Sequence, residues 1–144
     1  MATIRFDVND PDLQGSFLGQ LFLDALAALR DDTPPRWGKM TAQQMVEHLM
    51  WGFELSTGQA QVECPIPEER RVRMKGFLYH NRPSPHDFMN PALAGGLPPL
   101  RYARLAEAKA ALRVEVDRFL DHLRANTGAV HTHPVFGPIG VEEW

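Results

Sequence analysis

Histidines are the residues of this sequence best placed to do chemistry, and three of them stand out by their surroundings. His48 is the only ionisable residue within the broad apolar arc of a helix expected over residues 42–57. Burying an imidazole costs free energy unless its ring nitrogens find partners, and a metal ion is one such partner. Two interpretations stay open: His48 is a metal ligand, or it lies at the edge of the core and bonds a carbonyl or carboxylate.

His131 and His133 form a His-x-His pair near the end of the sequence. Two imidazoles at this spacing can reach one metal ion if the backbone is extended. The alternative is a solvated loop in which Pro134 restricts the backbone of His133 and so directs the chain. On the metal interpretation, the candidate ligands are His48, His131 and His133.

Other ionisable or nucleophilic groups are expected to be solvent-exposed or unremarkable. Glu47 and Glu54 fall with Gln43 on a narrow polar strip of the helix over 42–57, which indicates a role in solubility. Glu47 could instead support a metal ligand if that helix were rotated. The remaining histidines and the single cysteine have no obvious chemical partner at useful spacing: His80, His86, His122 and Cys64.

Apolar residues that recur every three or four positions predict the helices that must position these groups. The expected helices cover residues 11–30, 42–57, 68–80 and 101–126. The second has the clearest start, because Thr41 and Gln44 have the spacing of a capping box. The last carries a long apolar stripe and is followed by Gly128, which is expected to supply a left-handed stop.

Two segments are predicted to lack regular structure. Residues 81–99 contain Pro83, Pro85, Pro91, Pro98 and Pro99, which indicates a long irregular loop of the kind that often forms a wall or lid of a site. Residues 129–144 are rich in Gly, Pro and His and are also expected to form a loop, with 142–144 resembling the first turn of a helix. No alternating pattern predicts a strand.

Composition narrows the class of protein. With 144 residues, 44% of them hydrophobic, the chain is expected to form a single domain over residues 1–144. A net charge of −3 without a long Lys or Arg run argues against nucleic acid as a partner. No apolar stretch reaches the ~20 residues that span a membrane. The lack of a visible secretory signal and the lone Cys64 favour a cytoplasmic protein.

Three segments resemble an uncharacterised bacterial family of the DinB/YfiT-like superfamily. They are residues 37–49 (WGKMTAQQMVEHL), residues 81–85 (NRPSP) with Phe88, and residues 133–137 (HPVFG) with the final EEW. The resemblance implies an all-α, up-and-down four-helix bundle in which His48 matches the first metal ligand. The other two ligands of that pattern come from a closing helix that would follow Trp144. A bundle with an absent or shortened last helix is therefore expected, with His131 and His133 as replacement ligands.

The resemblance implies a metal-dependent enzyme, of the hydrolase or thiol transferase type, that acts on a small molecule. Zinc or nickel is the expected divalent ion, with an open coordination position that activates water or a thiol. The alternative is a non-catalytic helical module, for interaction or small-molecule binding, with a degenerate metal site. In that case apolar surface left by the absent helix is expected to pair two copies into a homodimer.

Overall fold

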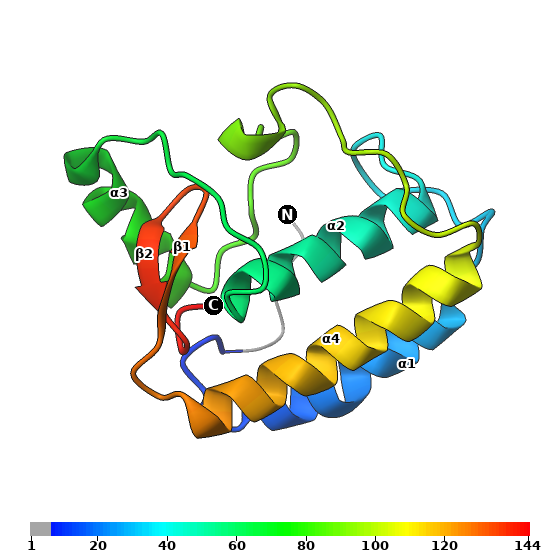
Figure 1. Cartoon of the computed structure of the whole chain (residues 1–144), viewed down its shortest axis with the longest axis horizontal. Helices are drawn as coiled ribbons and strands as arrows, with labels where there is room; N and C mark the ends of the chain where they lie inside the picture. Colours follow the sequence, from blue (N-terminus) through cyan, green and yellow to red (C-terminus); the bar gives the residue numbers. More distant parts are fainter. Residues whose placement is uncertain (1–6) are drawn as a thin grey trace.

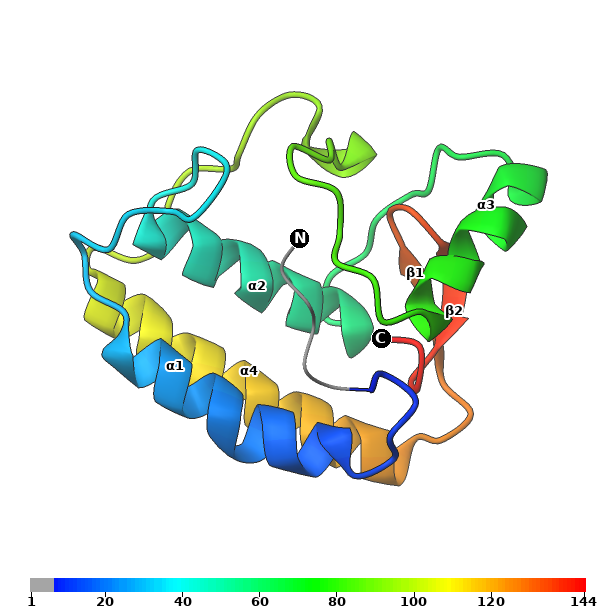
Figure 2. The same ribbon diagram turned by 180° about the vertical axis from the view of Figure 1, so that it is seen from behind.

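A computed structural model describes residues 7–144 of the chain as a mostly helical protein with a small two-stranded hairpin. Helices α1, α2 and α4 lie side by side, and α3 stands with the hairpin at one end (Figure 1). Seen from behind, α1 runs opposite to α2 and α4 (Figure 2). The helical elements are η1 (Gln14–Leu21), α1 (Phe22–Ala28), α2 (Ala42–Ser56), α3 (Glu68–Lys75), η2 (Gly76–Tyr79), η3 (Pro91–Leu93) and α4 (Leu105–Ala125).

The main core lies between α2 and α4. Val46 and Met50 of α2, and Leu112 and Val116 of α4, are almost completely buried. Leu26 of α1 belongs to the same cluster, so three helices share one core. Each such side chain stabilises the fold by roughly 1.5–3 kcal/mol through removal of apolar surface from water. None of the helices within residues 7–144 is both long and apolar enough to cross a membrane.

The start of α2 confirms the predicted capping box. The Thr41 side chain accepts a hydrogen bond from the Gln44 amide at 3.2 Å, and Gln44 Oε1 accepts one from the Thr41 amide at 2.9 Å. These two bonds satisfy amides that the first helical turn leaves without partners. The helix begins at Ala42 as predicted, because local contacts specify its start. It ends at Ser56, one residue before the predicted end.

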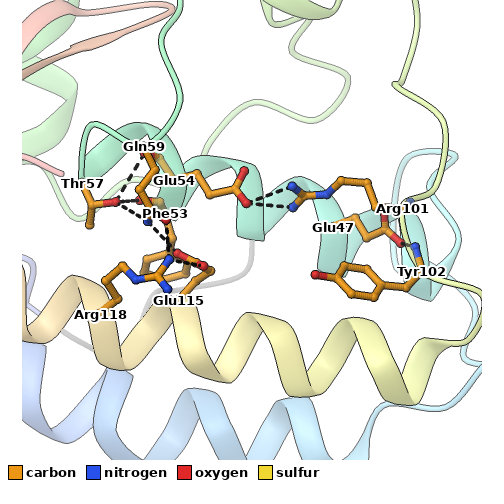
Figure 3. Close-up of polar contacts among 9 residues, drawn as sticks. All are labelled: Glu47, Phe53, Glu54, Thr57, Gln59, Arg101, Tyr102, Glu115 and Arg118. Carbon is orange, nitrogen blue, oxygen red and sulfur yellow. Dashed lines mark hydrogen bonds and ion pairs between the residues drawn. The ribbon is translucent and has the colours of Figure 1, made fainter.

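The prediction that Glu47 is solvated is wrong. Its carboxylate is buried and accepts hydrogen bonds from the backbone amides of Arg101, at 2.6 Å, and Tyr102, at 3.3 Å (Figure 3). Burial opposes ionisation, but bonds from Arg101, Gln43 and Tyr102 outweigh it and lower the pKa of Glu47. These bonds hold residues 101 and 102 against α2, and α4 begins after them, at Leu105 rather than at residue 101.

The other helical predictions are confirmed with adjustments. The helix expected over residues 11–30 begins as the more loosely wound π-helix η1, which contains Gly15 and Gly19, and continues as α1. The helix expected over 68–80 is α3 extended by the 3-10 turn η2. Gly128 is not left-handed; α4 ends at Ala125, where the Asn126 amide donates to the carbonyl of His122 at 2.9 Å.

The C-terminal segment contradicts the prediction of a loop without strands. Strand β1 (Val130–His133) pairs antiparallel with β2 (Gly137–Gly140), and His131 lies opposite Ile139. Gly137, which follows the turn, has a φ of 71°, a left-handed conformation that glycine adopts without steric cost. Val135, Ile139 and Val141 are buried, although none of them belongs to the cluster between α2 and α4. The fold is therefore mostly helical rather than all-α.

A matched pair of substitutions in α4 tests the main core. Leu112→Ala should lower the free energy of unfolding by about 2–5 kcal/mol, because it leaves a cavity between α2 and α4. Val114→Ala on the exposed side of the same helix should change stability by about 0.5 kcal/mol or less. Urea unfolding followed by circular dichroism measures both, and equal losses would contradict this packing.

Candidate functional site

His48 and His133 lie on the wall of one cavity, although they are far apart in the sequence. This hairpin cavity has a volume of about 270 Å³ and is bordered by α2, α4, the hairpin and the loop before η3. Its wall is formed by His48, Leu49, Trp51, Gly52, Phe53, Leu55, Ser56, Asn90, Phe119, His133, Pro134 and Trp144. The wall is apolar and aromatic, contains no Asp, Glu, Lys or Arg, and offers few polar groups. Such a composition is typical of a binding site for an uncharged organic molecule.

His48 is half-buried on α2 and makes no hydrogen bond with any part of residues 7–144. Its ring lies near Trp51, with the ring centroids 6.0 Å apart. Burial lowers the pKa of His48, so that the ring is neutral at physiological pH. His48 also borders a second cavity of about 240 Å³, the loop cavity, which lies between α2 and the segment from Leu93 to Arg101. Its imidazole is therefore available to a ligand.

The proton of His133 is fixed on Nε2 by the turn of the hairpin. Its Nδ1 accepts hydrogen bonds from the amides of Val135, at 3.0 Å, and Phe136, at 3.3 Å. An imidazole nitrogen that accepts is unprotonated, so in the neutral ring Nε2 carries the hydrogen. Burial lowers the pKa of His133 to about 4. The ring is thus a neutral donor, held between Phe136 and Trp144 at centroid distances of 4.6 Å and 5.0 Å.

Trp144, which borders the hairpin cavity, holds a buried donor without a partner in the described part of the chain. The indole Nε1 of Trp144 is buried and has no hydrogen-bond partner within residues 7–144. Buried indole groups in native proteins usually have one. Trp144 is held in place on both sides, because its amide donates to the carbonyl of Gly140 at 3.3 Å and its ring packs on His133.

His131 lies away from this cavity and contacts His122 instead. The Nε2 atoms of the two rings are 3.3 Å apart, and the His131 ring lies over Gly58, where an added Cβ would come within 2.6 Å of its Cε1 atom. His122, which was expected to be solvated, is partly exposed and contacts His131. The two histidines are nine residues apart, on either side of a chain reversal, and this spacing did not predict their contact.

The structure does not bring His48, His131 and His133 together as one three-histidine metal centre. Within residues 7–144 no group of three or more His, Cys, Asp or Glu side chains is placed to hold a metal ion. His131 is paired elsewhere, and the Nδ1 lone pair of His133 is already engaged by two amides while its Nε2 carries a proton. In the part of the chain that the structure describes, His48 is left as the one histidine of the three with a free ring nitrogen on the wall of the hairpin cavity.

The remaining sequence candidates lie outside the hairpin cavity. His86 stacks on Trp37 with the ring centroids 5.0 Å apart, and Glu54 pairs with the guanidinium of Arg101 at 2.9 Å. Cys64 is a free, partly buried thiol. Searches against family models, curated proteins and solved structures find no match for this chain. The function is therefore inferred from the geometry of these residues alone.

The lowered pKa of His133 predicts how stability depends on pH. Between its ordinary value of 6.5 and about 4, the unfolded chain binds a proton at this residue that the folded chain does not. The free energy of unfolding should therefore fall as the pH decreases through this window. His48 and His131, whose pKa values are also lowered, contribute in the same direction.

The substitution His133→Asn isolates the part due to His133, because an Asn side chain can still accept the turn amides. Its unfolding free energy, measured with urea at several values across the window, should depend less on pH than that of the wild type, by up to one proton. His86→Asn, at an exposed histidine, should keep the wild-type slope. Parallel profiles for the wild type and His133→Asn would contradict the buried neutral ring.

Proposed function

We propose that this protein binds a compact, uncharged organic molecule in the hairpin cavity. The observation that carries the proposal is that His48 and His133 border one apolar cavity, with the proton of His133 fixed on Nε2. A neutral ring that always presents a donor can select a ligand that carries an acceptor. The proposed function is therefore recognition of a small molecule by a few polar groups in an otherwise apolar pocket.

The cavity wall restricts the chemistry of the ligand. A volume of about 270 Å³ is close to the lower end of ligand pockets, which indicates a small molecule. Trp51, Phe53, Phe119 and Trp144 favour a planar or ring-shaped body. No cation faces the cavity, and both histidines are neutral, so a carboxylate would lose hydration without gaining a counter-charge. We therefore expect a neutral ring with a carbonyl-type acceptor.

Metal-dependent catalysis at His48 is the competing function, and it predicts a different result. Metal analysis of protein purified without chelators or a nickel column distinguishes the two. One equivalent of metal that is lost in His48→Ala would favour the enzyme. Equally strong ligand binding in metal-free protein would favour small-molecule binding, since the hydrogen-bond donor of His133 needs no metal.

We further infer that α1, α2 and α4 correspond to helices of the up-and-down bundle that the family resemblance implies. What supports this is the packing of α2 on α4 and the opposite direction of α1 (Figures 1 and 2). In an up-and-down bundle, helices of the same direction have another helix between them in the chain. Residues 57–104 would take the place of that intervening helix, and their helical structure consists of the short α3, η2 and η3.

Binding is tested with benzamide as a neutral probe and with benzoate and toluene as matched compounds. Benzamide should bind most tightly, because it combines a ring with an acceptor for the His133 Nε2 hydrogen. His133→Asn should weaken benzamide binding about fivefold, the equivalent of one hydrogen bond of about 1 kcal/mol, and should leave toluene unaffected. Chemical-shift titration of the full chain measures these affinities and shows which side chains respond.

The exposed His80 provides the control, because His80→Asn removes a histidine outside the cavity. Its affinities should equal those of the wild type. The proposal fails if benzamide shifts no resonance of His133, Trp51 or Trp144 at millimolar concentration. It also fails if benzoate binds better than benzamide, since that would require a cation that the cavity wall does not contain.

A further inference from the structure

His122 and His131 bring two imidazoles into direct contact. His122 lies in the last turn of α4 and His131 in β1, so the pair joins the end of the long helix to the hairpin. Their Nε2 atoms are 3.3 Å apart and their ring centroids 5.3 Å apart, with the ring planes tilted by 41°. Neither ring borders the hairpin cavity.

From this geometry we propose that His122 and His131 form a two-histidine site for a divalent cation of the zinc class, with water in the remaining positions. Zinc binds imidazole nitrogen at about 2.0–2.1 Å with tetrahedral angles, which places two ligand nitrogens about 3.3–3.4 Å apart. The observed separation of 3.3 Å matches this distance. An ion can therefore replace the shared hydrogen without moving the helix or the strand.

The surroundings hold both rings in place before any ion arrives. The His131 ring lies against the backbone of Gly58, whose φ of 77° suits a glycine, and any larger residue there would collide with the ring. Pairing with Ile139 fixes the strand that carries His131. Loss of ligand freedom on binding is then small, which favours a site with only two protein ligands.

The second nitrogen of His122 has a partner suited to a metal ligand. Its Nδ1 lies 3.2 Å from the side-chain amide of Asn126. Histidines that bind metal through Nε2 usually donate Nδ1–H to an oxygen. Turning the Asn126 amide by half a rotation places Oδ1 there, at the expense of its 3.3 Å bond to the His122 carbonyl.

The local charges are compatible with a cation. Arg118, one helical turn before His122, pairs with Glu115 at 2.6 Å and also donates to Gln59. Arg124 pairs with Asp121 at 2.9 Å. Burial and the neighbouring His122 lower the pKa of His131, so its ring is neutral near pH 7 and has a lone pair to give. Both nearby guanidinium groups are thus offset by carboxylates.

Zinc titration of the metal-free full chain tests the site. Isothermal titration calorimetry should give one dominant zinc equivalent for the wild type, and the imidazole resonances of His122 and His131 should shift together before those of other histidines. His122→Gln and His131→Gln should each weaken zinc binding about tenfold or more, whereas His80→Gln and His86→Gln should leave it unchanged. The double variant, with Gln at both 122 and 131, should bind zinc only slightly more weakly than either single variant. The difference is limited to the affinity that one remaining imidazole provides.

Thermal unfolding followed by circular dichroism without zinc shows whether a variant has lost only the site or the whole fold. If a variant unfolds, the imidazole resonances of the wild type still show whether zinc binds at His122 and His131. The proposal is overturned if zinc leaves the His122 and His131 resonances unshifted, or if His80→Gln weakens binding as much as His131→Gln. Benzamide binding in the hairpin cavity involves neither ring, so failure of one proposal leaves the other standing.

Discussion

The packing of α2 against α4 is the constraint on which the rest of the structure depends. Val46 and Met50 meet Leu112 and Val116 in an apolar seam that excludes water. Helices of this length gain most of their stability from such packing rather than from their own hydrogen bonds. Helix α1 packs on this seam through Leu26, and the hairpin contacts α2.

Two buried carboxylates connect the seam to the loops that leave it (Figure 3). Glu47 of α2 binds the amides of residues 101 and 102, just before α4 starts. Glu115 of α4 accepts a hydrogen bond from Gln59 at 2.8 Å, just after α2 ends. Helix α2 thereby holds the segment that leads into α4, and α4 holds the segment that follows α2. A buried carboxylate persists only when hydrogen bonds replace its hydration, and both of these have such partners.

Each carboxylate also shapes the surroundings of one histidine. By fixing Arg101 against α2, Glu47 places the outer wall of the loop cavity beside His48. By fixing Gln59, Glu115 holds the backbone around Gly58, on which the His131 ring rests. The loop cavity and the position of the His131 ring therefore both depend on how these loops are held against the seam. Neither is built from the helix faces alone.

Local signals in the sequence were sufficient for the helices and insufficient for the sites. The Thr41 and Gln44 capping box acts over three residues, and the stripe of α4 over one helix, so both could be predicted. The burial of Glu47 could not, because the amides that satisfy it lie some fifty residues away along the chain. The hairpin was hidden because Pro138 and Gly137 are atypical of strands, although both occupy places that this short hairpin tolerates.

The His-x-His segment shows why type and spacing did not identify the ligands. Residues two apart on a strand point to the same side, so His131 and His133 should face one partner. His133 is the last residue of β1, and its Nδ1 turns toward the amides of Val135 and Phe136 to close the hairpin. That bond takes its lone pair and leaves a donor, while His131 keeps a lone pair beside His122. Two neighbouring imidazoles thus acquire opposite chemistry, one suited to an acceptor group and the other to a cation.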